Sequence, residues 1–299
     1  MNPIFIRELK QLSRLKRTVV LLVMYNLLVT SLGFFAYYIT FGTQNSAGTY
    51  QYSIGYAGYA YNDILYIYLI ITAADLALLF LIIPAVTSGS ISSEREHQTF
   101  DILVSTGISP IKIITGKILS SISMALLLVV STLPVMALVF TIGGITLMGI
   151  IEFLCLIIVA AVFIASVGVF FSSICKTTTL STICTYAMVM FLTIGNVFIV
   201  CGSDVIRTIK ENGSFSSIVS TSAFGPSGIR SLLLLLNPVY SYAALMNSHT
   251  GNFADIFINL DMGSDIMYFC ANHWFIISMC AQIFVSALIQ ILSAKKLNQ

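Results

Sequence analysis

The sequence predicts an all-α integral membrane protein with six transmembrane helices in one transmembrane domain, residues 1–299. Composition is the first reason: 58 % of the residues are hydrophobic and 9 % are charged, against about 25 % charged residues in soluble domains. The second is that apolar residues gather in stretches as long as the ~20 residues that a helix needs to cross a bilayer. Because a helix satisfies its own backbone hydrogen bonds in lipid, we expect each stretch to be one spanning helix.

Residues 1–17 predict an amphipathic helix that lies on the membrane surface. Asn2 and Pro3 are typical of a helix start. Phe5, Leu9, Leu12 and Leu15 fall on one side of this helix, and Arg7, Lys10, Arg14 and Arg17 fall mostly on the other. A helix with one apolar and one basic side binds an anionic membrane surface.

The first predicted span is 18–41, which contains no charged residue. It is longer than the core of a signal peptide, which has about 7 to 15 residues, and no cleavage site follows it. The other predicted spans are 64–88, 118–141, 147–174, 180–201 and 274–292. Residues 42–61, rich in glycine and tyrosine, predict a loop at the membrane interface, and residues 175–179 predict a short polar link.

The long segment 202–273 precedes the last span and predicts a re-entrant or interfacial pair of helices on the outer side. Its apolar stretch 229–236 is broken at Asn237 and Pro238 and resumes as VYSYAALM. Neither half is long enough to cross the bilayer. Backbone of this kind is tolerated at membrane depth only where protein covers it.

The basic residues predict that both termini are cytoplasmic. Cytoplasmic loops of membrane proteins carry an excess of lysine and arginine. With six spans, the inner set is Arg7, Lys10, Arg14, Lys16, Arg17, Arg95, Lys112, Lys117, Lys176, Lys295 and Lys296, and the outer set is Arg207, Lys210 and Arg230. A seventh span near Leu234 would place the terminal lysine pair outside, so we favour six.

The loop 92–117 between the second and third spans concentrates formal charge and predicts a helix, a turn and a second helix. Ser93 and Glu96 have the spacing of a capping box, which predicts a helix start near Glu94. Gly107 is suited to ending this helix. Ser109 followed by Pro110 is typical of the start of the next helix.

The first helix of this loop has one acidic and one apolar side, which predicts a protein partner. Glu94, Gln98, Asp101 and Ser105 share one side, and Phe100, Leu103 and Val104 form a neighbouring apolar stripe. The cytoplasmic leaflet is negative and attracts basic segments, so an acidic helix should not lie on it. An exposed apolar stripe on such a helix predicts docking in a groove of another protein.

Sequence motifs for catalysis are missing, so we expect that the chain is not an enzyme. Gly116 and Lys117 are adjacent, but the surrounding residues do not complete a phosphate-binding loop. The three histidines show no zinc-binding spacing, and the six cysteines include no CxxC pair. We expect no metal site, no nucleic-acid partner and contact with membrane lipid.

Two carboxylates lie within predicted spans, Asp75 near the middle of the second and Glu152 nearer the outer end of the fourth. An unpaired charge at the bilayer centre costs at least ~2.5 kcal/mol. Asp75 is therefore either a group of a transport or proton pathway or a buried residue bonded to a Thr, Tyr or Asn of another span. In the fourth span, the pairs Ala161 with Ala165 and Gly168 with Ser172 permit close helix contact.

The whole chain resembles the ABC-2 type permeases of ATP-binding cassette transporters. Its basic N-terminal helix opens NPIFIREL, and its most specific part is the loop SSEREHQTFDILVSTGISPIKIITGK. The family pattern matches at Glu94, Glu96, Thr99, Phe100, Leu103, Pro110, Gly116 and Lys117. Two positions depart from it, since Gln98 stands where glycine is frequent and Gly107 where proline often occurs.

The resemblance implies a permease subunit of an ATP-driven exporter in a cell membrane, bacterial by expectation. Loop 92–117 would be the coupling helix that contacts a cytoplasmic ATPase subunit through Glu94, Glu96, Thr99, Phe100, Leu103 and Val104. The ATPase subunit would bind ATP and Mg, and a second permease subunit, identical or different, would complete the substrate path. The alternatives are an ion-coupled secondary transporter that uses Asp75 and Glu152, and a non-transporting subunit that passes on a mechanical signal.

Overall fold

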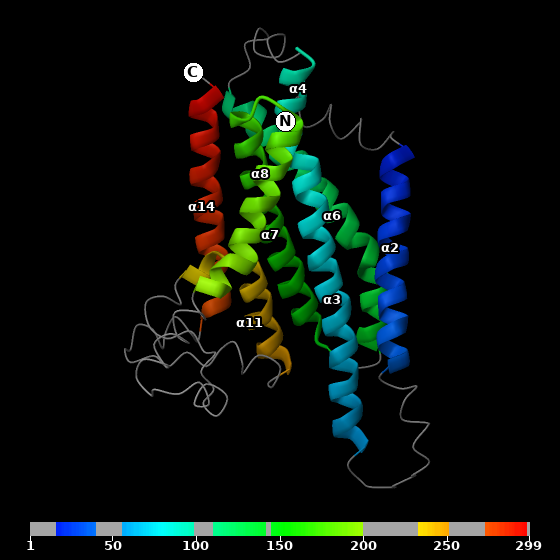
Figure 1. Cartoon of the computed structure of the whole chain (residues 1–299). Coiled ribbons are helices and arrows are strands. Elements are labelled where there is room, and N and C mark those ends of the chain that lie inside the picture. The colour runs from blue at the N-terminus through cyan, green and yellow to red at the C-terminus, as the bar shows by residue number, and fades with distance from the viewer. Residues whose placement is uncertain are drawn as a thin grey trace, which may run out of the picture.

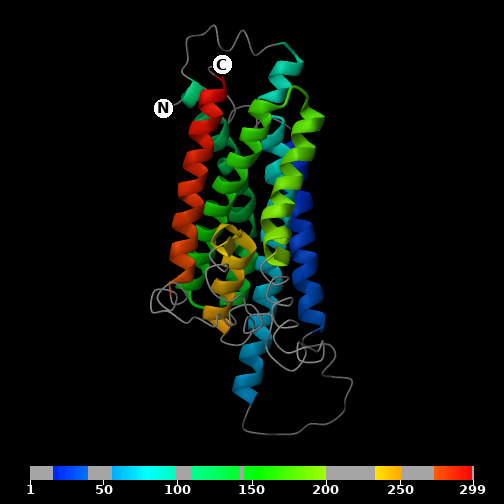
Figure 2. The same cartoon turned by 60° about the vertical axis from the view of Figure 1, so that its left-hand side comes forward.

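The computed structural model describes residues 16–39, 56–98, 110–141, 145–199, 233–250 and 273–297, and these form a helical bundle without strands. The helices are α2 (Lys16–Tyr37), α3 (Tyr56–Ser88), α4 (Ser92–Glu96), α6 (Pro110–Thr141), α7 (Leu147–Ile174), α8 (Thr178–Met190) with the π-helix η3 (Phe191–Gly195), α11 (Pro238–Thr250) and α14 (Trp274–Leu297). Figures 1 and 2 show α2 at one edge of the bundle and α14 at the other.

Six of the described helices are long and apolar enough to span a membrane, as the sequence predicts. They are Thr18–Tyr37, Leu65–Glu96, Ile111–Thr141, Leu147–Ile174, Thr178–Ile199 and Trp274–Lys296. The fourth has the predicted bounds, and its first turn is capped by the Thr146 hydroxyl, which accepts a hydrogen bond from the Gly149 N–H at 3.2 Å. The helix α6, which contains the third span, begins at Pro110, where the sequence predicts a helix start.

The start of α3 corrects one prediction. The loop 42–61 was expected to end before the second span, but α3 begins at Tyr56 and so includes the last residues of that segment. A helix of 33 residues is about 50 Å long, which exceeds the ~30 Å of hydrocarbon. The tyrosines of this segment suit the interface equally well from a helix. The surface helix predicted for 1–17 lies outside the described residues, apart from the start of α2.

The bundle is built around α7, which contacts α3, α6, α8, α11 and α14 and is the most buried of the six spans. Its small residues permit close approach: Ala161 and Ala165 are fully buried, and Gly168 faces Thr87 of α3. A Cβ added to Gly168 would lie 2.0 Å from the Thr87 Oγ1. The predicted close contact of the fourth span is confirmed at this glycine.

The outer segment enters the bundle through α11. Residues 233–236 form a 3-10 turn, Asn237 interrupts it, and α11 follows, so the predicted break is confirmed. Tyr242, Leu245 and Met246 of α11 belong to the main core, and α11 contacts α3, α7, α14 and η3. At 13 residues, α11 is too short to cross the bilayer.

The beginning of α2, the short helix α4 and the end of α14 lie at the same end of the bundle (Figures 1 and 2). This is the arrangement that an even number of spans produces. The end that carries α4 is called the loop end below, and the opposite end the outer end.

Candidate functional site

The short helix α4 begins the predicted coupling loop 92–117, of which the structure describes residues 92–98 and 110–117. It begins at Ser92 with Ile91 as its N-cap, and no side chain of the loop itself caps it. The predicted capping box of Ser93 and Glu96 is therefore wrong. The Ser172 hydroxyl of α7 takes over the capping role, because it accepts hydrogen bonds from the N–H groups of Ile91 at 2.8 Å and Ser92 at 2.9 Å.

The end of α4 also differs from the prediction. The helix was expected to continue from Glu94 to Gly107, but it ends at Glu96, and Gln98 has a φ of 57°. This left-handed conformation is strained for a residue with a Cβ and free of strain for glycine. It supplies a physical reason why glycine is frequent at this position in the family that the loop resembles. Four predicted partner-binding residues, Thr99, Phe100, Leu103 and Val104, lie outside the described residues.

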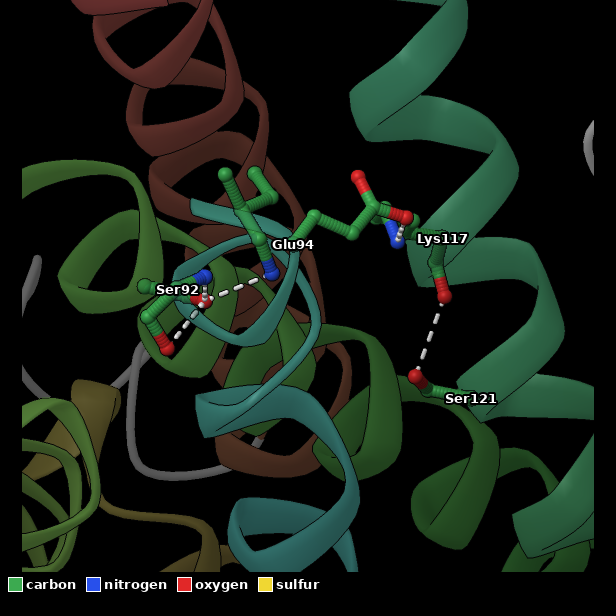
Figure 3. Close-up of polar contacts among 6 residues, drawn as sticks. Ser92, Glu94, Lys117 and Ser121 are labelled. Carbon is green, nitrogen blue, oxygen red and sulfur yellow. Dashed lines mark hydrogen bonds and ion pairs between the residues drawn. The ribbon is translucent and has the colours of Figure 1, made fainter. Parts of the chain in front are cut away.

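An ion pair joins α4 to α6. The Lys117 Nζ donates a hydrogen bond to the Glu94 Oε1 at 3.0 Å, and the lysine side chain is only 5 % exposed. Figure 3 shows Glu94 reaching across to Lys117, whose backbone carbonyl accepts a hydrogen bond from the Ser121 hydroxyl. A buried lysine requires a charged or polar partner. Glu94 therefore fixes α4 against the start of the third span, and its contact with another protein stays a prediction.

A second carboxylate joins α4 to α8. The Glu96 Oε2 accepts hydrogen bonds from the Thr178 Oγ1 at 2.8 Å and from the Thr178 N–H at 3.2 Å. Thr178 is the first residue of α8, so Glu96 caps that helix from outside. This explains why Glu96 does not close a capping box on Ser93. This contact does not test the predicted role of Glu96 in binding a partner protein, which stays a prediction.

Asp75 lies fully buried between three spans. Its Oδ1 accepts a hydrogen bond from the Tyr25 hydroxyl of α2 at 2.9 Å, and its Oδ2 lies 3.0 Å from the donating Thr132 Oγ1 of α6. This geometry agrees with one of the two interpretations of the sequence, in which Asp75 is a buried residue that is hydrogen-bonded to side chains of other spans. A pathway role stays a prediction.

A row of buried polar side chains of α3 continues from Asp75 toward the outer end of the bundle. The Thr72 Oγ1 lies 2.9 Å from the Tyr242 hydroxyl of α11, and this hydroxyl also donates to the Leu69 carbonyl at 2.9 Å. The Tyr68 ring packs edge-on against Phe153 of α7, with ring centroids 6.3 Å apart. Tyrosines of α3 and α11 thus join the outer half of the bundle.

Glu152 has a partner that the sequence did not indicate. The His249 Nε2 of α11 lies 3.2 Å from the Glu152 Oε2 of α7. The sequence does not indicate this contact, because His249 lies far from Glu152 in the chain and no local motif relates the two residues. Asp75 and Glu152 thus lie beside different residues, and the contact of Glu152 with His249 is an ion pair when the histidine is protonated.

A polar cluster between α11 and α14 was also missed. The Gln282 Nε2 donates to the hydroxyls of Ser241 at 3.0 Å and Ser278 at 3.1 Å, and those two hydroxyls contact each other. The Ser278 hydroxyl donates to the Leu235 carbonyl at 2.8 Å. A signal was present in the sequence, since Ser278 and Gln282 are four residues apart on one side of the last span.

The described residues contain a loop helix that is hydrogen-bonded to three other helices and a bundle with buried polar contacts, and they contain no metal centre. No group of three or more His, Cys, Asp or Glu residues there could hold a metal ion.

The sequence matches the family described as ABC-2 family transporter protein over residues 2–292. No curated protein matches the chain.

Proposed function

The chain belongs to the ABC-2 family of transporter proteins, and from this premise we propose that it is the permease subunit of an ATP-driven exporter. Membership of the family and the six apolar helices make it a membrane permease. The proposal goes further in three respects: hydrolysis of ATP drives transport, the direction is outward, and the loop 92–117 transmits the energy from a separate ATPase subunit.

The observation that carries this proposal is how α4 is attached. Contacts to three helices fix it: Glu94 accepts from Lys117 of α6, the N–H groups at its start donate to Ser172 of α7, and Glu96 accepts from Thr178 of α8. A loop that only links two spans does not require ties to three other helices. A loop that receives a force from a partner does, because the force has to reach the spans.

The partner is a cytoplasmic ATPase subunit, which supplies the ATP and Mg site that the sequence of this chain does not provide. A second permease subunit, identical or different, completes the pathway. The loop end of the bundle is then cytoplasmic, together with both termini. The excess of basic residues assigned to that side supports this orientation, and a bacterial cell membrane is the proposed location.

The test is a double variant of the loop, Phe100→Ala with Leu103→Ala. Loss of these two apolar side chains from an interface costs on the order of 1 to 3 kcal/mol each. We expect the ATPase subunit to separate from the membrane fraction, or its hydrolysis to become independent of substrate. The measurements are co-purification and substrate-stimulated ATPase activity.

Ser105→Ala, at a polar residue of the same loop, is the matched control and should leave both measurements unchanged. The double variant should insert into the membrane and melt like the wild type, because these side chains were not assigned to a span. Full partner binding and coupling in the double variant would show that the loop is not the coupling element. The ion-coupled transporter that uses Asp75 would then be the better interpretation.

A further inference from the structure

The transmembrane helix α8 and its π-helix are bonded to the coupling loop at one end and to the outer segment at the other. Figures 1 and 2 show α4 beside the upper end of α8 and α11 near its lower end. We propose that α8 relays movement of α4 to α11, with Glu96 and Asn237 as the positioning residues at its two ends. This inference rests on the proposed function.

The loop end of α8 is bonded to α3 and α4 over its first turns. Thr178 donates twice to Glu96, and one turn later the Ser181 hydroxyl donates to the Ser88 carbonyl at 2.7 Å. The Thr182 hydroxyl lies 2.9 Å from the Ser88 hydroxyl. Since Ser88 ends α3 and lies just before α4, a displacement of α4 also displaces the start of α8.

The outer end of α8 is bonded to the start of α11 through one side chain. The Asn237 Nδ2 donates to the Thr193 carbonyl at 2.7 Å. Its Oδ1 accepts hydrogen bonds from the N–H groups of Val239 at 3.0 Å and Tyr240 at 3.3 Å, which caps α11. Asn237 is fully buried, so water does not compete for these bonds.

The bonded carbonyl lies within the π-helix η3. A π-turn interrupts the regular backbone ladder of an α-helix, and such turns occur frequently at functional sites. Here the interruption coincides with the point where α8 is tied to another segment. A helix that changes its hydrogen-bond pattern at this point moves the cap of α11 with it.

One side of α8 is not covered by the described helices of this chain. About a fifth of its most apolar stretch is buried inside the chain, against 72 % for α7, and Leu180, Ile183, Met190 and Phe198 are exposed. Its other side is packed on α7 and α3, and the Tyr186 hydroxyl donates to the Leu81 carbonyl of α3 at 2.6 Å. Since a helix with few buried contacts shifts more readily than a buried one, α8 can move together with α3, and the bonds at its two ends then move with it.

The experiment measures whether the two ends are energetically coupled. The full chain, with its six native cysteines replaced by serine or alanine, carries Ser248→Cys on the exposed outer part of α11. The rate at which a fluorescent maleimide labels this cysteine is measured in lipid nanodiscs. Glu96→Ala removes both hydrogen bonds of the inner tie, whereas Thr178→Val removes the hydroxyl bond and keeps the N–H bond. Asn237→Ser keeps the cap of α11 but is too short to reach the Thr193 carbonyl.

We expect Glu96→Ala to change the labelling rate about twofold to fivefold, and Thr178→Val to change it in the same direction but less, because the N–H bond remains. Combining the two should change the rate no further than Glu96→Ala alone, because that variant already removes both bonds. In the Asn237→Ser background the inner variants should have no effect, since the relay is already interrupted. The control pair Thr115→Val with Ser123→Ala removes two hydroxyls of α6 that are bonded to carbonyls of their own helix, and it should leave the rate at the wild-type value.

Three outcomes would overturn the relay. They are an unchanged rate in both inner variants, an equal change in the control pair, and an inner effect that persists in Asn237→Ser. If Asn237→Ser does not accumulate as a folded protein, the inner variants and the control pair decide the question. No ATPase is present in this assay, so its failure is distinct from failure of ATPase binding in the loop variants.

Discussion

Removal of the Asp75 carboxylate tests what this buried group does in the bundle. Asp75→Leu deprives the Tyr25 hydroxyl of its acceptor, and Tyr25 is itself buried. Thr132 keeps a bond, because its hydroxyl also donates to the Val129 carbonyl at 2.8 Å. Hydrogen bonds between spans contribute about 0.6 kcal/mol on average and about 1.7 at most. For two such bonds we expect a loss of about 1 to 3 kcal/mol.

Asp75→Asn should cost much less, because the shape and both contacts are retained. The amide oxygen accepts from the Tyr25 hydroxyl, and the amide nitrogen donates to the Thr132 oxygen, whose own proton remains directed at a backbone carbonyl. In the Asp75→Leu background, Tyr25→Phe should cost little more, since the partner of this hydroxyl is already lost.

The assay is thermal: the temperature at which half of the monodisperse gel-filtration peak in detergent is lost. For a chain of 299 residues, a loss of 1 to 3 kcal/mol corresponds to a decrease of about 2 to 5 °C. Equal decreases for the leucine and asparagine variants would refute the hydrogen-bond reasoning, because the two differ in that respect. A pathway role for Asp75 requires a different result, namely reduced transport in Asp75→Asn with an unchanged melting temperature.

Two further predictions concern backbone contacts. Gly168→Ala places a Cβ 2.0 Å from the Thr87 Oγ1 and should lower the stability by about 1 to 3 kcal/mol through overpacking. Gly89→Ala, with nothing within 4 Å, is the control, and Thr87→Gly should restore part of the loss. Equal melting temperatures of the two alanine variants would contradict the clash. Gln98→Gly should stabilise the turn after α4 by about 1 kcal/mol. The melting temperature should rise in this variant and not in Gln98→Ala. A lower melting temperature of Gln98→Gly would contradict the backbone strain at this position.

The spans and several of their ends were predictable because their signals are local. Apolar length is read along the chain, and residues such as Thr146 and Pro110 mark helix starts by the chemistry of a single turn. The start of α3 at Tyr56 was not predictable in this way. Tyrosine and glycine describe an interface, and whether that interface is crossed by a loop or by a helix depends on the neighbouring helices.

The candidate site was only partly predictable because its bonds join residues that lie far apart in the chain. Ser93 and Glu96 have the local spacing of a capping box, yet Ser172 and Thr178 offer better partners once α7 and α8 are in place. For Asp75 the sequence indicates the type of partner but not which residue. The reason is that many threonines and tyrosines in the other spans have the same chemistry.

The polar contacts of the bundle divide by their environment, and this division suits a protein that has to move. Asp75 and Asn237 form bonds inside the bundle, where no water competes for them, so these bonds are costly to break. Glu96 is bonded to Thr178 in an exposed position, where water replaces a lost hydrogen bond at small cost. The contacts that hold the spans together are therefore persistent, while a contact that ties the loop to α8 is exchangeable. In the proposed relay, a small displacement of the loop reaches α8 through a bond that can reform in a new position, while the buried bonds keep the spans together.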